Sequence, residues 1–393
     1  MIPIEAWRNE TPGCSTSIHF NNAGASLMPL PVLNAIQSHL NLEARVGGYE
    51  AFEDRGEEIQ KFYSATGKLI GSRPDNIAFT SSATNSFARA LSSIPFKKGD
   101  CVLIANEDYI SNQLALLSIK ERFGINLLRV PSTEKGGVDL NALREMAIKH
   151  RPVLISLTHV PTNSGLVQPA VEVGKICNEL NIPFLLDACQ SAGQLHLDVR
   201  EIGCDFLSAT FRKFLRGPRG AGFLYVSDKI LQQNWYPLFI DMKGADWTER
   251  DHFRIQKNAQ RFEDWELPYS LLLGSSAASE YVNKIGIQTI EERNRELMRY
   301  LKNTLSTMGW HTLDRGDQTC SILTIHFPKV DPKVLHRKLR DQKINTSVSL
   351  GNYALIDFES KNVDWALRIS PHYYNTEEEI DLLTDALDKI TGS

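Results

Sequence analysis

Short apolar runs alternate with segments of helical periodicity between about residues 76 and 226, and this alternation limits the fold more than any other feature. The runs read as strands that are buried on both faces, as parallel strands usually are. Pro169 suits the first turn of one intervening helix, "PAVEVGKICNEL". The pattern predicts a large α/β domain with a mostly parallel sheet. The predicted strands are "CVLIA", "INLLRV", "VLISLTHV", "PFLLDA", "CDFLSAT" and "GFLYV".

Beyond about residue 270 the pattern changes to longer helices and fewer strands, which predicts a smaller α+β domain. We expect the large domain over residues 15–270 and the small one over 271–393, joined by residues 1–14. No flexible linker separates them, so they are expected to pack on each other. The predicted elements are one or two helices over 275–309, a strand over 320–327, a helix over 331–344 that Asp331 caps, and a helix over 376–390 with a Thr376/Glu379 capping box.

Composition excludes several function classes. A net charge of −4 over 393 residues shows no bias toward polyanions, so nucleic acid is not an expected partner. No apolar run approaches the ~20 residues of a membrane helix, and the N-terminus resembles neither a signal nor a transit peptide. We therefore expect a cytoplasmic protein without a membrane partner. The six cysteines form no CxxC pair, so neither a metal site nor a disulfide framework is expected.

The stretch "LSATFRKFLRGPRGAGFLYV" places Lys213 between a predicted strand and a turn rich in glycine and arginine. Burial and the neighbouring Arg212 should lower the pKa of the lysine amine and make it a usable nucleophile. Lysine nucleophiles form imines, and the commonest cofactor that uses one is pyridoxal 5′-phosphate. A surface lysine in a basic hairpin is the alternative interpretation.

The run "FLLDACQSAG" ends a predicted strand in Asp187, and a buried carboxylate needs a partner. A protonated pyridinium nitrogen would supply that partner, and Gln190 follows where it can reach the ring hydroxyl. Asp187 could instead cap the next turn.

The cofactor phosphate would need donors, and "TSSATNSFARAL" leads from small residues, Ser81 to Thr84, into a helix N-terminus that favours an anion. Thr210 and Arg212 would add a hydroxyl and a charge. Taken alone, the segment favours an ordinary helix cap, and only together with the other residues does it predict a phosphate site. Tyr109 follows the strand "CVLIA", where its ring could stack on a pyridine face, or could be an ordinary core or exposed tyrosine.

The chain resembles the class V aminotransferase family of fold-type I pyridoxal phosphate enzymes, which includes cysteine desulfurases, selenocysteine lyases, kynureninase and isopenicillin N epimerase. The resemblance covers nearly the whole length. It implies a large domain with a mostly parallel seven-stranded sheet, a smaller C-terminal α+β domain and a homodimer. The motifs that carry it are "FNNAGASLMP", "FTSSATNS", "THVPTNSG", "LLDACQSAGQLHLDV", "CDFLSATFRKFLRGPRGAGFLYV" and "LRISPHYYNTEEEID".

The resemblance also implies roles for single residues. An arginine suits a substrate carboxylate because its planar fork grips both oxygens, although a surface salt bridge is the alternative for Arg368. The implied roles are the cofactor-bound lysine for Lys213, the pyridinium partner for Asp187, the ring-oxygen contact for Gln190, ring stacking for Tyr109, phosphate binding for Ala83, Thr84, Thr210 and Arg212, a place beside the cofactor for Asn163, and substrate binding for Asn22 and Arg368.

Departures from the family pattern refine the expected function. The region "SVSLGNYALIDFESKNVDWALRIS" lacks the mobile cysteine of cysteine desulfurases, and Arg212 replaces the usual histidine before the lysine. "EARVGGYEAF", "RKFLRGPRG" and "RISPHYYNT" look most like ergothioneine-pathway carbon-sulfur lyases. The first of these could bring Tyr49 and Glu50 to a substrate pocket or form only a turn between helices.

We therefore expect a pyridoxal phosphate-dependent lyase that cleaves a carbon-sulfur bond of a small cysteine-derived amino acid by β-elimination. An aminotransferase, an epimerase and a cysteine or selenocysteine lyase begin with the same chemistry and stay open. A non-catalytic relative that retains the fold is a further alternative. The segment "RFEDWELP", residues 261–268, is expected to approach the phosphate of a neighbouring subunit.

Overall fold

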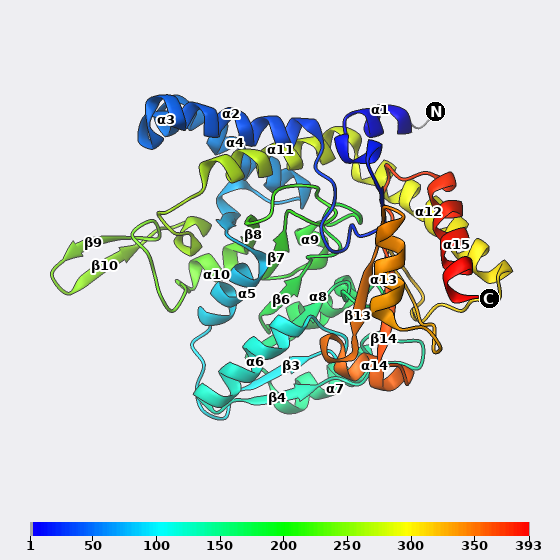
Figure 1. Ribbon diagram of the computed structural model, residues 1–393. Coiled ribbons are helices and arrows are strands. Elements are labelled where there is room, and N and C mark those ends of the chain that lie inside the picture. The colour runs from blue at the N-terminus through cyan, green and yellow to red at the C-terminus, as the bar shows by residue number, and fades with distance from the viewer. Residues whose placement is uncertain (1–2, 393) are drawn as a thin grey trace.

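A seven-stranded sheet forms the centre of the computed structural model, which describes residues 3–392 (Figure 1). The strand order is β2-β8-β7-β6-β5-β3-β4, and the five strands from β7 to β4 run parallel. The mostly parallel seven-stranded sheet expected from the sequence is thus confirmed. The strands are β2 (Ile77–Thr80), β3 (Cys101–Ile104), β4 (Asn126–Arg129), β5 (Leu154–Thr158), β6 (Phe184–Asp187), β7 (Phe206–Thr210) and β8 (Gly222–Val226).

Two strands differ from the sequence-based expectation, and one was missed. The run "GFLYV" became β8, which is antiparallel to both neighbours. Only residues 211–221 connect it to β7, which is shorter than the dozen or more residues that a parallel crossover needs. The run "INLLRV" became the edge strand β4, which has one neighbour and is therefore partly exposed. Strand β2 was not among the predicted strands.

Helices cover both faces of the sheet, because successive strand residues point to opposite sides. Leu185, Phe206 and Leu224 pack on one face, and Leu186, Leu207 and Phe223 on the other. The first face carries α5 (Ala83–Ser92), α6 (Ile110–Phe123) and α10 (Asp228–Gln232), and the second carries α4 (Gly56–Leu69), α7 (Leu140–His150), α8 (Ala170–Glu179), α9 (Val199–Ile202) and α11 (Tyr269–Ile285).

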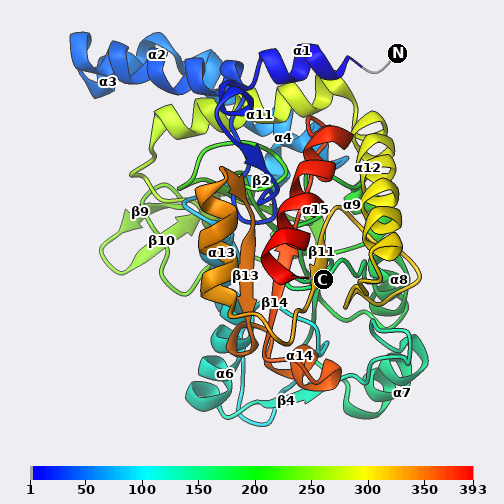
Figure 2. The same cartoon turned by 45° about the vertical axis from the view of Figure 1, so that its right-hand side comes forward.

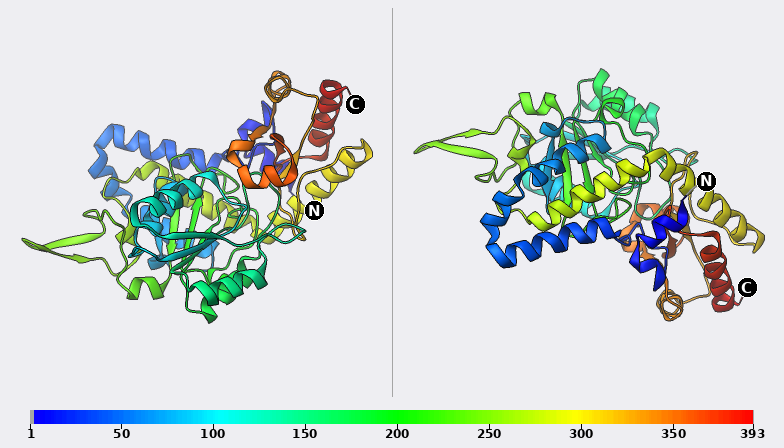
Figure 3. Two further views of the ribbon diagram at one scale, coloured as in Figure 1. Left: turned by 90° about the horizontal axis from the view of Figure 1, so that it is seen from below. Right: turned by 90° about the horizontal axis from the view of Figure 1, so that it is seen from above.

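An outer layer and a hairpin extend beyond this core. Helix α2 (Leu30–Val46) runs beside α11, and α3 (Gly48–Asp54) continues from it, as the right-hand view of Figure 3 shows. Strands β9 (Ala245–Glu249) and β10 (His252–Ile255) form a protruding hairpin that was not predicted. The remaining short elements here are α1 (Ile4–Asn9), η1 (Pro12–Ser15), η2 (Pro74–Asn76) and η3 (Ala259–Phe262).

The C-terminal part has its own hydrophobic cluster around a three-stranded antiparallel sheet of order β11-β14-β13 (Figure 2). The range 275–309, for which one or two helices were predicted, belongs to two helices that Gly286, with a φ of 89°, separates. The Asp331 cap and the Thr376/Glu379 capping box form as predicted. The elements are α12 (Ile287–Thr307), β11 (Leu323–Ile325), α13 (Pro332–Asp341), β12 (Ile344–Asn345), β13 (Ser347–Leu350), η4 (Gly351–Tyr353), α14 (Leu355–Lys361), β14 (Trp365–Ile369) and α15 (Glu377–Thr391).

Segments that are distant in sequence connect the two clusters. Strand β1 (Ile18–His19) pairs with β12, and Phe20 belongs to the C-terminal cluster. Trp7 belongs to the cluster of the central sheet. The domain boundaries expected from the sequence stay predictions. None of the helices within residues 3–392 combines the length and the apolar composition that crossing a bilayer requires.

The fully buried guanidinium of Arg216 joins three parts of the chain. Its Nε donates to the Leu27 carbonyl at 3.0 Å, Nη1 donates to the Tyr373 hydroxyl at 2.6 Å, and Nη2 donates to the Thr11 hydroxyl at 2.5 Å. It also lies 4.3 Å from the centroid of the Tyr374 ring, a cation-π contact. The turn after β7 is thereby held against both the N-terminal segment and the segment after β14.

Replacing Arg216 by methionine should lower the free energy of unfolding by about 2–4 kcal/mol, because three buried acceptors lose their donor. Arg216→Lys should be destabilising too, since an ammonium cannot reproduce the planar fork. The measurement is urea denaturation of the cofactor-free protein. Arg219→Met, at an exposed position of the same turn, is the matched control, and equal stability of the two methionine variants would contradict this account.

Candidate active site

Lys213 lies just after the end of β7 and is buried, with 6% of its surface exposed. Burial, the largest cause, lowers the pKa of its amine to about 8. The guanidinium groups of Arg212 and Arg368 also lower this pKa, while Cys189 and Asp187 act against them. The structure therefore does not support a surface lysine in a basic hairpin. The amine has the lowered pKa expected of a nucleophile or base.

Asp187 ends β6, the strand beside β7, and is 3% exposed. Its Oδ1 accepts the Cys189 N–H at 2.8 Å, so the carboxylate does cap the following turn. Its Oδ2 accepts a hydrogen bond from the Asn112 side chain at 2.7 Å. Both donors are uncharged, which leaves the carboxylate able to pair with a cation.

Gln190 occupies the turn that follows Asp187. Its side-chain nitrogen donates to the Ala23 carbonyl at 3.1 Å and to the Thr162 hydroxyl at 2.6 Å, while its Oε1 is buried without a partner. Gly193 makes this turn possible, because a Cβ at its φ of 92° would lie 2.5 Å from the Phe214 carbonyl carbon. The Asp187 turn therefore packs directly against the chain that follows Lys213.

The predicted phosphate donors gather around the first residues of α5. Ser82 caps the helix, and Ala83 and Thr84 open it, so their N–H groups have no partner within the helix. Gly222 of β8 lies opposite both Thr80 and Thr210, and a Cβ there would lie 2.8 Å from the Ala83 nitrogen. This close approach brings the helix N-terminus beside the end of β7.

Thr210 and Arg212 have contacts within the chain. Thr210 donates its hydroxyl to the Ala221 carbonyl at 3.3 Å, and the Arg212 guanidinium donates to the Gly24 carbonyl. Burial, followed by the charge of Arg219, lowers the pKa of Arg212. Their phosphate-binding roles stay predictions.

The remaining predicted residues come from three separate parts of the chain. Tyr109 caps α6, and its ring centroid lies 5.7 Å from the Lys213 Nζ. Asn163 is 4% exposed and donates to the Tyr353 carbonyl at 3.2 Å. Arg368 lies on β14, and burial lowers its pKa to about 10.

Arg368 is not part of a surface salt bridge, because it is 6% exposed and donates to uncharged acceptors. Its Nη1 reaches the Thr162 carbonyl at 3.2 Å and its Nη2 reaches Asn21 Oδ1 at 3.1 Å, whereas its Nε is buried without a partner. The structure places Asn21, not Asn22, against the guanidinium. Asn22 is fully buried and bonds to the Ser370 carbonyl and the Tyr374 hydroxyl, so its predicted contact with substrate is not favoured.

Two residues near Asp187 were not predicted. Asn112 bridges Asp187 and Asp108, donating to Asp108 Oδ1 at 3.2 Å. Burial raises the pKa of the Asp108 carboxyl. The spacing of four residues between Asp108 and Asn112 at a helix start was a signal that could have identified the pair.

Two other predicted segments lie away from Lys213 within the chain, and the expected approach of "RFEDWELP" to a neighbouring subunit stays a prediction. Tyr49 is 72% exposed in the first turn of α3. In the "GGYEAF" segment only Gly47, with a φ of 103°, lies between α2 and α3, and the other residues form the start of α3. Tyr49 lines a pocket with Trp265 and Tyr269, and neither Lys213 nor Asp187 lines that pocket. In "RFEDWELP", Arg261 bonds to carbonyls of its own chain and Glu263 accepts the Phe79 N–H at 2.7 Å.

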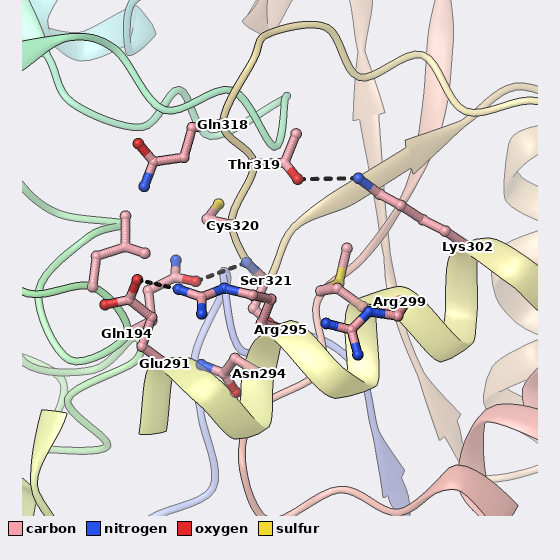
Figure 4. Close-up of a pocket in the computed structure, with 12 residues that line it drawn as sticks. Gln194, Glu291, Asn294, Arg295, Arg299, Lys302, Gln318, Thr319, Cys320 and Ser321 are labelled. Carbon is pink, nitrogen blue, oxygen red and sulfur yellow. Dashed lines mark hydrogen bonds and ion pairs between the residues drawn. The ribbon is translucent and has the colours of Figure 1, made fainter. Parts of the chain in front are cut away.

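A cavity of about 300 Å³ lies between α12 and residues 318–321 (Figure 4). Arg295, Arg299 and Lys302 line one side of it. Gln194 lines the other side, accepts the Ser321 N–H at 2.9 Å and donates to the Gln190 carbonyl. No predicted site residue lines this cavity, so it is separate from the site around Lys213.

The site around Lys213 fits pyridoxal phosphate. It offers a deprotonable amine, a carboxylate without a cationic partner, an open helix N-terminus and an aromatic ring. The buried Gln190 Oε1 and Arg368 Nε are polar atoms without partners, and such atoms call for a ligand. The donors suit a cofactor and an amino-acid carboxylate.

Arg212→Gln should raise the pKa of Lys213 above about 8, because one neighbouring cation is removed, yet keep it below the ~10.4 of an ordinary lysine, because burial remains. The measurement is the pH dependence of Lys213 acetylation by acetic anhydride in cofactor-free protein, followed by mass spectrometry. Arg219→Gln is the control and should leave the midpoint near 8. A wild-type midpoint near 10.4, or a lower one in Arg212→Gln, would contradict the electrostatic account.

Comparisons with known proteins agree with this geometry. A probable cysteine desulfurase from Methanothermobacter thermautotrophicus is 28% identical over 98% of this chain and 97% of its own length. A probable hercynylcysteine sulfoxide lyase from Mycobacterium tuberculosis is 27% identical over 99% and 94%. The fold also matches an apo cysteine desulfurase structure from Thermococcus onnurineus NA1, with a TM-score of 0.90, 23% identity and coverage of 100% and 99%.

The family model for class-V aminotransferases matches residues 18–383, which is nearly the whole chain. The matched range includes every residue that the sequence predicted for the site. The protein therefore belongs to the class-V aminotransferase family and is a pyridoxal phosphate-dependent enzyme.

Proposed function

We propose that the protein is a carbon-sulfur lyase that acts on a cysteine-derived amino acid by β-elimination. The observation that carries this proposal is the buried Lys213 amine, whose lowered pKa suits it to remove a proton, near Arg368, whose buried Nε has no partner. One relative is named as a hercynylcysteine sulfoxide lyase. A structural neighbour with a TM-score of 0.85 is named as a cystine C–S lyase.

Lys213 would bind the cofactor aldehyde, and Asp187 would pair with the ring nitrogen. Gln190 would contact the ring oxygen, and Tyr109 would stack on the ring. The N-terminus of α5 would bind the phosphate. Pyridoxal phosphate bound there supplies an aldehyde for the substrate amine and a ring that accepts electrons.

The remaining steps belong to residues of the chain. Arg368 binds the α-carboxylate of the substrate, and Asn163 lies beside the bound substrate. The Lys213 amine takes the proton from the α-carbon. The bond between the β-carbon and sulfur breaks, and the sulfur leaves with the electron pair and a proton as a thiol. Water hydrolyses the released aminoacrylate, so that one substrate and one water yield thiol, pyruvate and ammonia.

The cysteines do not favour a desulfurase relay. Residues 347–370 contain no cysteine, and five of the six thiols are buried. Cys189 interacts with the Lys213 charge, but burial, the largest cause, raises the pKa of its thiol well above the usual range. A thiol in that state is a poor acceptor of sulfur.

We also propose that the protein is a cytoplasmic homodimer. The family resemblance supports the dimer, and the sequence composition supports the location.

The test is pyruvate release from S-methylcysteine without any keto acid. An aminotransferase needs a keto-acid acceptor and an epimerase releases no pyruvate, so only elimination gives this product. Pyridoxal phosphate absorbance of the purified protein is followed in parallel. Racemised substrate, or a product that forms only after a keto acid is added, would instead support those alternatives.

Lys213→Ala should lower pyruvate release by at least ~10²-fold, which is the usual contribution of a positioned base. Arg368→Gln should raise KM more than it lowers kcat, because its charge holds the ground-state carboxylate. Steady-state kinetics measure both effects. Arg299→Gln, which lines the separate cavity of Figure 4, is a control that should match the wild type.

A further inference from the structure

A second cavity, of about 230 Å³, opens directly beside the active site, between α6 and residues 352–357. Asn163 lines this cavity, and its side-chain nitrogen donates to the carbonyl of Tyr353, which lines the cavity too. Ile110 lines it too and directly follows Tyr109, whose ring lies beside Lys213. A substituent that extends from a substrate past Asn163 would therefore enter this cavity.

The lining is mainly apolar. Leu114 is 59% exposed and Leu355 is 62% exposed, and Tyr353 is 47% exposed beside them. Single exposed apolar residues are normal, but these line one cavity together. The apolar and aromatic side chains of the lining are Ile110, Leu114, Leu117, Pro161, Tyr353, Ala354, Leu355 and Ile356.

The acidic groups of the lining already have partners within the chain. Glu107 accepts the Ser132 hydroxyl at 2.8 Å, and Asp357 pairs with the Lys361 ammonium at 2.8 Å. Asp108 accepts a hydrogen bond from Gln113 at 2.6 Å and others from Thr158 and Asn112. Lys361 therefore neutralises Asp357, whereas uncharged donors of the chain hold the carboxylates of Glu107 and Asp108.

The one cation of the lining is Arg129. Its Nη2 donates to Gln113 Oε1 at 2.5 Å, and its Nη1 is buried without a partner. Asp108 interacts with its charge, and Glu107 lines the same cavity. An anionic group would therefore meet at least as much negative as positive charge.

We propose that this cavity binds the leaving group of the substrate and that the group is uncharged and apolar, of about the size of a benzyl thiol. The proposal rests on the proposed elimination and names its substrate class: a cysteine S-conjugate with an aryl or alkyl substituent. The substituent packs against α6 and the 352–357 segment and leaves as the apolar thiol R–SH after the carbon-sulfur bond breaks.

The test compares S-benzyl-, S-carboxymethyl- and S-(2-aminoethyl)-cysteine, which carry a neutral, an anionic and a cationic substituent. The benzyl conjugate should have a kcat/KM at least about tenfold above the other two, the discrimination expected of an apolar pocket. Leu114→Asn and Leu355→Asn should each lower the benzyl-to-methyl ratio of kcat/KM about tenfold. Leu382→Asn, at a leucine that is 54% exposed on α15, is the matched control and should leave that ratio unchanged.

A binding measurement separates this inference from the proposed reaction. N-acetyl-S-benzylcysteine cannot react through its blocked amine, so calorimetry reports binding alone, and Leu114→Asn should weaken that binding about tenfold. If this binding is found but no conjugate yields pyruvate, the cavity's ligand class stands and the proposed reaction fails.

Three outcomes would overturn the inference. The first is a preference for the charged conjugates, and the second is an unchanged benzyl-to-methyl ratio in Leu114→Asn. The third is a change in molar mass of Leu114→Asn by light scattering, which would make the cavity a contact between subunits.

Discussion

The buried guanidinium of Arg216 fixes the turn on which the candidate active site depends. Three hydrogen bonds and a tyrosine ring hold it, and its partners belong to the N-terminal segment and to the segment after β14. Lys213 precedes it by three residues, and the Arg216 N–H donates to the Lys213 carbonyl. The same contacts that stabilise the packing of distant segments therefore also orient the turn that carries Lys213, the lysine that we propose reacts.

The site holds more positive than negative charge. Next to burial, the largest cause, Arg212 and Arg368 lower the pKa of Lys213, and Arg212 also lowers the pKa of Arg368, while Asp187 raises that of Lys213. This excess of positive charge suits a cofactor phosphate and a substrate carboxylate, because each anion relieves the repulsion among the cations. Burial strengthens the effect, since charges interact more strongly away from water.

The sequence could predict features that depend on local pattern or on strand ends. Parallel strands end at one edge of the sheet, where Asp187 is the last residue of β6 and Lys213 and Tyr109 follow β7 and β3. The sequence could not predict features set by distant packing. The direction of β8 depends on a short connection, and the choice of Asn21 over Asn22 depends on how residues 20–22 lie beside β14. The Asn112 bridge likewise forms only once α6 docks beside β6.

Gly286 separates α11, which packs with the central sheet, from α12, whose later part packs with the C-terminal cluster. Lys213 and Asp187 lie on the sheet side of this elbow, whereas Arg368 lies on the other side. The hydrogen bonds of Arg216 to Tyr373 and of Arg368 to the Thr162 carbonyl join the two sides across the elbow. The spacing between Arg368 and the lysine-aspartate side is therefore set by these cross-links and not by Gly286 alone.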